Sequence, residues 1–257
     1  MADLGNFVTI RETFTLPSRG KVYGIPDFNP EITLRSMTNA EDMLLTGYSE
    51  NEYRKLSDVI QACIVSEKPK VDVYDMCIGD YEFLLHKLRI VTYGSEYAMA
   101  IQCPNCGEVV KSTVSLDDIR EVVFDSDAIG NREITLPVSK LKVKLAFQTP
   151  RSLDQIKERA KEYKKKRNTP GVNYDVMFEV MSFIQKIDGE QVNDAMLEDF
   201  VLKMPAKDAR YIIQRGRELN GKVGLDTSII AKCPECGYEV LTRFQYQSEF
   251  LNPTIPA

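Results

Sequence analysis

Two short motifs of the pattern C-P-x-C-G constrain this chain most, at Cys103–Gly107 and Cys233–Gly237. In each motif, two thiolates separated by two residues can hold one tetrahedral ion from a tight turn, and a second pair completes four ligands. The proline presets the turn, and the glycine can take the positive φ that lets the chain reverse. Because 126 residues (107–232) separate the two pairs, the chain must leave the site, build another structure and return to close it.

Apolar, strand-like runs flank both motifs, at 98–101, 109–110, 228–231 and 239–241. Each motif with its flanks therefore predicts a strand–knuckle–strand unit, as in zinc ribbons, although the gap between the pairs is far longer than in an ordinary ribbon. We expect one structural zinc ion per chain. Its predicted ligands are the four cysteines of the motifs: Cys103, Cys106, Cys233 and Cys236.

Other uses of these cysteines stay open from the sequence. A thioredoxin-like redox pair needs a helix directly after the motif, whereas β-branched runs follow both pairs. Structural disulfides need an oxidising compartment, and Met1–Gly5 lacks the basic and apolar regions of a signal peptide. Rubredoxin knuckles also read C-P-x-C-G, so iron is an alternative to zinc. Two separate sites, or one site that no longer binds metal, are further alternatives.

The remaining cysteines and the single histidine do not extend the predicted site. Cys63 falls on the apolar face of a predicted helix and Cys77 at a helix entrance, where small buried side chains are common. His86, the only histidine, lies inside a helical run at 81–90. Four thiolates fill a tetrahedron and leave no position for water or substrate, so the predicted site is structural and does not catalyse hydrolysis.

Composition narrows the function classes. The chain has 257 residues, of which 43% are hydrophobic and 28% charged, with a net charge of −5. No apolar run approaches the roughly 20 residues of a membrane span, and the negative charge argues against general nucleic-acid binding. There is no P-loop, G-x-G-x-x-G, H-E-x-x-H or G-x-S-x-G motif. We therefore expect a protein that is not an enzyme and has no small-molecule substrate.

The expected fold class is α+β, with a zinc-ribbon-like β element formed by the two distant knuckles and helical segments before and between them. Five segments follow from this expectation: an extended N-terminal arm or hairpin (1–35), a helical segment (36–94), the first zinc knuckle (95–120), a hairpin with a helical insert (121–225), and the second zinc knuckle with an extended C-terminal tail (226–257).

The first segments contain clear element boundaries. Strands are predicted at 7–10, 14–16 and 31–35. A capping box that begins at Thr38 opens a helix that stops at Gly47, and a second box at Ser49 opens a longer helix. Asp80 is predicted to cap a third helix that ends at Gly94.

The later segments alternate strands and helices. Predicted strands lie at 133–137, 141–145 and 242–246, predicted helices at 152–167, 174–187, 193–203 and 205–219, and an extended tail at 250–256. The basic run 161–167 suits a solvated helix end whose cations face the C-terminal dipole, and contact with an acidic partner is the alternative. Methionines at 177, 181, 196 and 204 are either core filler or an adaptable docking surface.

Several longer stretches carry a resemblance to a known family. They are Leu16–Tyr23 (LPSRGKVY), Ile32–Glu41 (ITLRSMTNAE), Leu88–Gly94 (LRIVTYG), Ile187–Gly189 (IDG), and the second knuckle followed by Phe250–Pro253 (FLNP). With these stretches the chain resembles the T-even-type bacteriophage baseplate protein family, over most of its length. Phe250-Leu251 stands where two aromatic residues are expected, which is a small departure.

The resemblance implies a non-enzymatic structural component of a contractile-tail baseplate hub, made in the host cytoplasm and located in the virion tail. Its implied partners are other baseplate and tail proteins, such as the hub, tail tube or tape-measure protein. One alternative is an assembly chaperone that is absent from the finished virion. Another is a zinc-ribbon nucleic-acid binder, which needs a basic face near the knuckles, whereas Glu108, Glu235 and Glu239 lie there.

Overall fold

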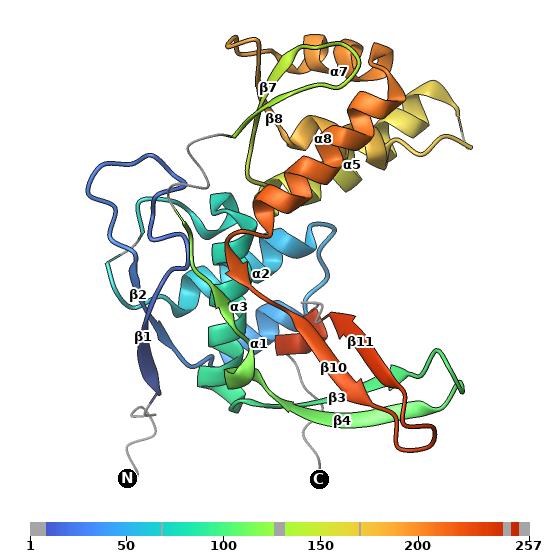
Figure 1. Ribbon diagram of the computed structural model, residues 1–257. Coiled ribbons are helices and arrows are strands. Elements are labelled where there is room, and N and C mark those ends of the chain that lie inside the picture. The colour runs from blue at the N-terminus through green and yellow to red at the C-terminus, as the bar shows by residue number, and fades with distance from the viewer. Residues whose placement is uncertain (1–8, 68, 126–131, 170, 244–247, 252–257) are drawn as a thin grey trace, which may run out of the picture.

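The computed structural model describes residues 9–67, 69–125, 132–169, 171–243 and 248–251. Figure 1 shows a first lobe around helix α3, a second lobe above it, and two β-hairpins that cross beside the first lobe. The architecture therefore mixes helices and sheet, as the sequence predicts. Among the described residues, no helix combines the length and the apolar character that crossing a bilayer requires.

The first lobe is formed by the N-terminal elements. These are β1 (Arg11–Thr15), β2 (Glu31–Arg35), α1 (Asn39–Thr46), α2 (Glu52–Cys63), the short 3-10 helix η1 (Val73–Asp75) and α3 (Ile78–Tyr93). β1 and β2 form an antiparallel pair, and α3 runs through the centre of the core. The strand predicted at 31–35 is confirmed. The strand predicted at 7–10 is not, because β1 begins at Arg11; residues 7 and 8 lie outside the described part of the chain.

Helix starts in this lobe only partly follow the local sequence. The capping box is confirmed at Thr38 and Glu41, and α1 ends before Gly47 as predicted. The second box is wrong, because the Ser49 hydroxyl binds within its own turn and α2 begins at Glu52. Asp80 is not a cap either, since α3 begins two residues earlier at Ile78. At α2 a carboxylate from a distant helix, described below, replaces the predicted local cap. At α3 the Ile78 N–H donates to the distant Gln148 carbonyl (2.8 Å), and the Asp80 carboxylate binds Ser18 and Tyr23 instead.

The second lobe occupies the long gap between the knuckles. Its elements are β6 (Glu133–Thr135), β7 (Lys142–Leu145), α5 (Pro150–Arg167), α6 (Asp175–Ser182), β8 (Ile184–Ile187), α7 (Asp194–Lys203) and α8 (Ala206–Asn220). β6, β7 and β8 form a three-stranded antiparallel sheet. The helices pack against it around a hydrophobic core that is distinct from that of the first lobe.

One predicted helix of this lobe, at 174–187, is wrong in its second half. α6 ends at Ser182, and Ile184–Ile187 form strand β8 beside β7. Apolar residues at helical spacing continue through the boundary, but pairing with β7 satisfies the backbone of this segment and keeps Ile184 buried. A long-range sheet contact thus outweighs the local periodicity. The other predicted helices are confirmed to within two residues at each end.

The chain leaves the first lobe and returns to it at one place. β5 (Glu121–Val122) pairs antiparallel with β9 (Gly224–Leu225), so the two ends of the second lobe lie side by side. Directly before β5 runs the hairpin β3 (Glu96–Gln102) and β4 (Val109–Ser115), joined to β5 by the 3-10 helix η2 (Leu116–Asp118). Directly after β9 runs the hairpin β10 (Ser228–Lys232) and β11 (Glu239–Arg243).

The C-terminal end corrects one further prediction. Phe250 and Leu251 belong to the 3-10 helix η3 (Ser248–Leu251) and are buried in the core of the first lobe, where an extended tail was expected. Their two large apolar side chains account for this burial. The predicted strand at 242–246 is confirmed only for 242–243, because 244–247 lie outside the described residues, as do 252–256 of the predicted tail.

Candidate metal centre

The two knuckles meet at the crossing of the two hairpins (Figure 1). In each knuckle the backbone N–H of the first cysteine donates to a carbonyl oxygen across the turn, from Cys103 to Glu108 (2.8 Å) and from Cys233 to Tyr238 (2.9 Å). The glycine that follows each pair takes the predicted positive φ, at 78° and 72°. The local sequence therefore forms both turns as expected, and the strands bring the turns together.

The four knuckle cysteines present their sulfur atoms to one point. The Sγ atoms of Cys103, Cys106, Cys233 and Cys236 all lie within 4.8 Å of one another. Across the two knuckles, Cys103 and Cys236 are separated by 3.7 Å and Cys106 and Cys233 by 3.6 Å. All four cysteines are free, and these separations are much longer than a disulfide bond of about 2.05 Å.

The sulfur spacing fits a tetrahedral thiolate site. A zinc ion with four thiolates at about 2.3 Å has sulfur–sulfur edges of about 3.8 Å, close to the separations between the knuckles. A small apolar core supports the arrangement, since Val110, Ala231 and Val240 are buried beside Cys103 and Cys233. The donor set and its spacing are therefore compatible with zinc, and with iron in the same coordination.

Electrostatics within the cluster differ between the two exposed thiols. Hydrogen bonds from the Asn105 side chain and the Tyr238 backbone N–H lower the pKa of Cys236 to about 6. The backbone of Glu108 lowers the pKa of Cys106, but the neighbouring sulfur of Cys236 and desolvation outweigh it and raise that pKa to about 12. Hydrogen bonding thus lowers the pKa of one exposed thiol, whereas the neighbouring sulfurs raise the pKa of the other.

The other cysteines and the histidine lie elsewhere, as predicted. Cys63 is buried in the core of the first lobe, and burial raises its thiol pKa to about 12. Cys77 is buried at the N-cap position of α3. Burial lowers the pKa of His86 to about 4, and its Nε2 lies 2.9 Å from the carbonyl oxygen of Leu116.

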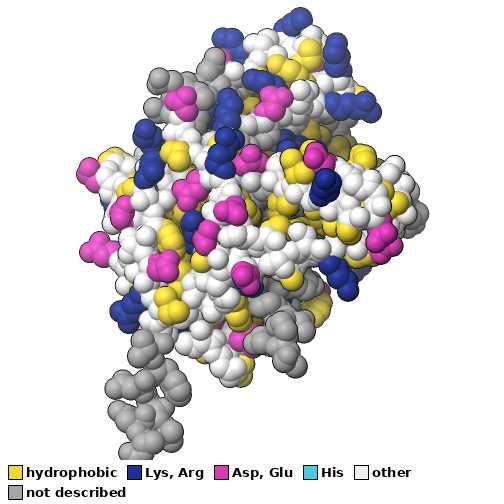
Figure 2. Space-filling view, turned by 60° about the horizontal axis from the view of Figure 1, so that its bottom comes forward, with side chains coloured by type: hydrophobic (Ala, Val, Ile, Leu, Met, Phe, Trp, Pro, Cys, Tyr) yellow, Lys and Arg dark blue, Asp and Glu magenta, His cyan; other side chains and the backbone are white. Residues whose placement is uncertain are grey.

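The surface around the knuckles carries acidic side chains. Glu108, Glu235 and Glu239 are all exposed. On the face drawn in Figure 2, acidic and basic side chains are intermixed, although basic ones gather towards its upper edge. Exposed Lys111, Lys232 and Arg243 lie on the same two hairpins, so the described surface near the cluster carries both charges and is not uniformly basic.

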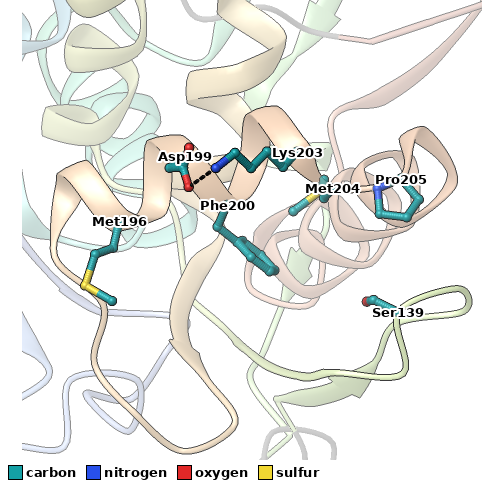
Figure 3. A pocket seen from close by; sticks show the side chains of 7 residues that line it. All are labelled: Ser139, Met196, Asp199, Phe200, Lys203, Met204 and Pro205. Carbon is teal, nitrogen blue, oxygen red and sulfur yellow. Dashed lines mark hydrogen bonds and ion pairs between the residues drawn. The ribbon is translucent and has the colours of Figure 1, made fainter.

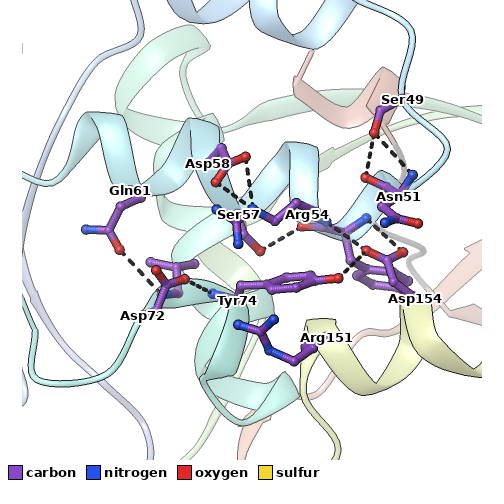
Figure 4. A network of polar contacts seen from close by, with 12 residues as sticks. Ser49, Asn51, Arg54, Ser57, Asp58, Gln61, Asp72, Tyr74, Arg151 and Asp154 are labelled. Carbon is purple, nitrogen blue, oxygen red and sulfur yellow. Dashed lines mark hydrogen bonds and ion pairs between the residues drawn. The ribbon is translucent and has the colours of Figure 1, made fainter.

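A polar network between the lobes is a feature that the sequence analysis missed (Figure 4). Asp154 of α5 is buried and accepts hydrogen bonds from the backbone N–H groups of Tyr53 (3.4 Å) and Arg54 (2.9 Å) at the start of α2, and from the Tyr74 hydroxyl (3.1 Å). Beside it, Arg151 makes a two-point ion pair with Asp75. No local signal reveals a cap that lies 100 residues away.

An apolar groove of about 430 Å³ lies on the second lobe, between α7, the start of α8 and the β6–β7 turn (Figure 3). Phe200 and Met204 point into it, flanked by the Asp199–Lys203 ion pair. Met196, on the same side, is 61% exposed, whereas Met177 and Met181 are buried. The methionines are thus divided between core filler and surface.

Comparison with known protein families gives a match over most of the chain. The model of a protein family described as T4 bacteriophage base plate protein matches residues 9–252. No curated protein and no solved structure is significantly similar to the chain.

Proposed function

Because this chain belongs to the T4 bacteriophage base plate protein family, we propose that it is a non-enzymatic structural component of the baseplate hub in a contractile phage tail. The observation that carries the proposal is the family match, which spans both lobes and both knuckles. Proteins of the hub, the tail tube or the tape-measure are the proposed partners, and the virion tail is the proposed location.

We further propose that the four clustered cysteines hold one structural zinc ion in each chain. Sulfur atoms within 4.8 Å of one another support this assignment. When bound, the ion supplies folding free energy, because it ties together two hairpins that are far apart in the sequence. With four protein ligands the site is closed, so its role is to hold the crossing hairpins in place.

Metal analysis of the purified chain tests the zinc proposal. We expect about one zinc per chain, and Cys106→Ser or Cys236→Ser should abolish stoichiometric binding and lower the melting temperature strongly. Glu235→Ser is the matched control, because it changes an exposed residue of the same turn without removing a sulfur. Full stability without metal, or iron in place of zinc, would contradict the zinc assignment and leave the baseplate role intact.

Mass spectrometry of purified virions and of assembly intermediates tests the baseplate role. A structural component should be present in both, at a fixed ratio to known baseplate proteins. Presence in the intermediates alone would replace the proposal by an assembly chaperone. Absence from both, with no tail protein co-purifying, would overturn it.

A nucleic-acid-binding role is less well supported. The exposed glutamates beside the knuckles would repel a phosphate backbone. A salt-dependent mobility shift with DNA or RNA would be the result that favours it.

A further inference from the structure

Strand β11 has an unpaired outer edge in the described structure, because β10 and β11 form a sheet of two strands only. The Cys233 N–H donates to the Tyr238 carbonyl, and this bond fixes which residues of β11 are hydrogen-bonded to β10. In an antiparallel ladder, residues alternate between pointing their N–H and C=O groups towards the partner strand and away from it. Glu239, Leu241 and Arg243 therefore direct theirs to the open edge.

The outer face of the same hairpin is apolar at its middle. Ile230 and Leu241 lie directly opposite each other and are 67% and 70% exposed, whereas Ala231 and Val240 face the small core beside the cysteines. An open strand edge beside exposed apolar side chains is a template for pairing with another strand. The hairpin therefore has the features of an interface for a β-strand.

The sequence of β11 indicates which strand fits. Glu-Val-Leu-Thr-Arg is complementary to itself in the antiparallel direction. If two copies pair about Leu241, Glu239 of each copy lies opposite Arg243 of the other, and the two Leu241 side chains meet between them. Neither residue has an ion-pair contact within 4.0 Å in the described part of the chain. Glu239 nevertheless lies opposite Lys232 in its own hairpin, and the pKa of Asp226 is lowered by hydrogen bonds from Ser228 and further by the charge of Arg243.

We propose that two copies of this chain associate by antiparallel pairing of their β11 strands, on a two-fold axis at Leu241. The pairing joins both hairpins into one sheet of four strands and places Ile230 and Leu241 of both copies in one continuous apolar row. Opposite charges that face each other across strands stabilise such a pair, and like charges destabilise it. A single strand edge is a small interface, so the dimer forms at high protein concentration.

The neighbouring edge of β4 lacks this complementarity. The Cys103 N–H donates to the Glu108 carbonyl, so by the same alternation Val109, Lys111 and Thr113 face the open edge. Symmetric pairing about Lys111 would set two ammonium groups against each other. Of these two edges, β11 alone is therefore complementary to itself. The proposed self-association goes beyond the baseplate role, which a monomer could also perform.

Charge-reversal variants test the proposal. Sedimentation of the full chain over a range of concentrations measures the dissociation constant of the dimer for each variant. Glu239→Arg and Arg243→Glu should each weaken the dimer about tenfold or more, because each change converts two attractive pairs into two repulsive ones. The double variant Glu239→Arg/Arg243→Glu restores opposite charges and should restore the dimer. Lys111→Glu on β4 is the matched control and should leave association unchanged.

A monomer at every concentration would overturn the proposal, as would a dimer that either single reversal leaves unchanged or that the double variant does not restore. Wild-type hydrogen exchange gives a second measurement if a variant misfolds. The amides of Glu239, Leu241 and Arg243 should exchange more slowly at high than at low protein concentration. Equal exchange rates at both concentrations would also contradict the proposed dimer.

Discussion

Two buried carboxylates show how single side chains fix the first lobe. Asp80 accepts hydrogen bonds from the Ser18 backbone N–H (2.9 Å), the Ser18 hydroxyl (2.5 Å) and the Tyr23 hydroxyl (2.6 Å). Burial raises the pKa of Asp80, against the lowering effect of these bonds. Glu41 instead makes a two-point ion pair with Arg35 and accepts from Thr38. The two carboxylates anchor the N-terminal turns to α3 and α1.

The Glu41 ion pair predicts a pH dependence of stability. The hydrogen bonds from Arg35, together with those from Thr38, lower the pKa of Glu41 from 4.5 to about 2 in the folded protein. A lowered folded-state pKa stabilises the protein above the unfolded value, and this stability is lost as the pH falls from about 4.5 to about 2. Glu41→Gln should remove this contribution, at most about 3 kcal/mol.

Denaturant unfolding at pH 7 and at pH 3 measures the effect. The difference between wild type and Glu41→Gln should shrink at the lower pH. Asp42→Asn is the control, because it changes the adjacent acid of the same helix start and leaves the Arg35 pair in place. An equal loss at both pH values would show that the ion pair is not the cause.

At the scale of elements, α2 starts where α5 supplies its cap. The Asn51 side chain makes no capping hydrogen bond, and the carboxylate of Asp154 binds the first free N–H groups of α2 instead. The same carboxylate accepts from Tyr74, so it joins α5 to two elements of the first lobe. A negative charge at this point also complements the positive end of the α2 dipole.

Removal of this cap should destabilise the chain. Asp154→Ala leaves the α2 amides and the Tyr74 hydroxyl without their acceptor, at a cost of about 1–3 kcal/mol. The measurement is the free energy of unfolding in denaturant. Asp58→Ala is the matched control, since it removes an exposed ion pair with Arg54 on the same helix, worth less than about 1 kcal/mol. Equal losses in the two variants would contradict the capping role.

A second element contact depends on the absence of a side chain. Gly79 in the first turn of α3 lies against the backbone of β9, and a Cβ there would clash with the Val223 carbonyl oxygen. Gly79→Ala should therefore separate α3 from β9 and destabilise the protein by about 1–3 kcal/mol. Gly171→Ala, where a Cβ has open space, should change stability little. Thermal unfolding of both variants separates the effect of the clash at Gly79 from a general effect of introducing alanine. An unchanged melting temperature for Gly79→Ala would contradict the close contact between α3 and β9.

At the scale of the whole molecule, we propose that segment 121–225 contains a separable insertion. Val122 and Gly224 are paired neighbours in the β5–β9 sheet, so the chain enters and leaves the second lobe at one point. The second lobe has its own hydrophobic core. The cysteine cluster, by contrast, is formed only by the hairpins next to β5 and β9.

Excision of the second lobe tests this organisation. Replacing 125–221 by a short glycine–serine linker should leave about one zinc per chain, because both hairpins and their base remain. Stability should fall, because the contacts that α5 makes with α2 are lost. The same excised chain with Cys106→Ser should bind no stoichiometric metal. A failure of the excised chain to bind zinc, while the full chain binds it, would contradict separability.

Local signals predicted the elements that short segments form by themselves. The knuckle turns follow from proline, glycine and cysteine spacing, and the Thr38 capping box from four adjacent residues. In the second lobe, apolar periodicity predicted the helix over Asp175–Ser182, and Pro205 predicted the start of α8. The grouping of all four cysteines in one candidate site was also predicted, because two C-P-x-C-G motifs are complementary halves of one tetrahedron.

Other features needed the tertiary structure, since each depends on a partner far along the chain. Strand β8 (Ile184–Ile187) forms by pairing with β7, and α2 begins where Asp154 of α5 accepts hydrogen bonds from its first N–H groups. Phe250 is buried because it packs into the hydrophobic core of the first lobe. The sequence by itself determined the two knuckle turns and the Thr38 cap, whose partners are only a few residues away. It also determined the chemistry of the four thiols. The fold alone decided which distant surfaces meet, because burial and strand pairing are shared between segments and are not a property of either one.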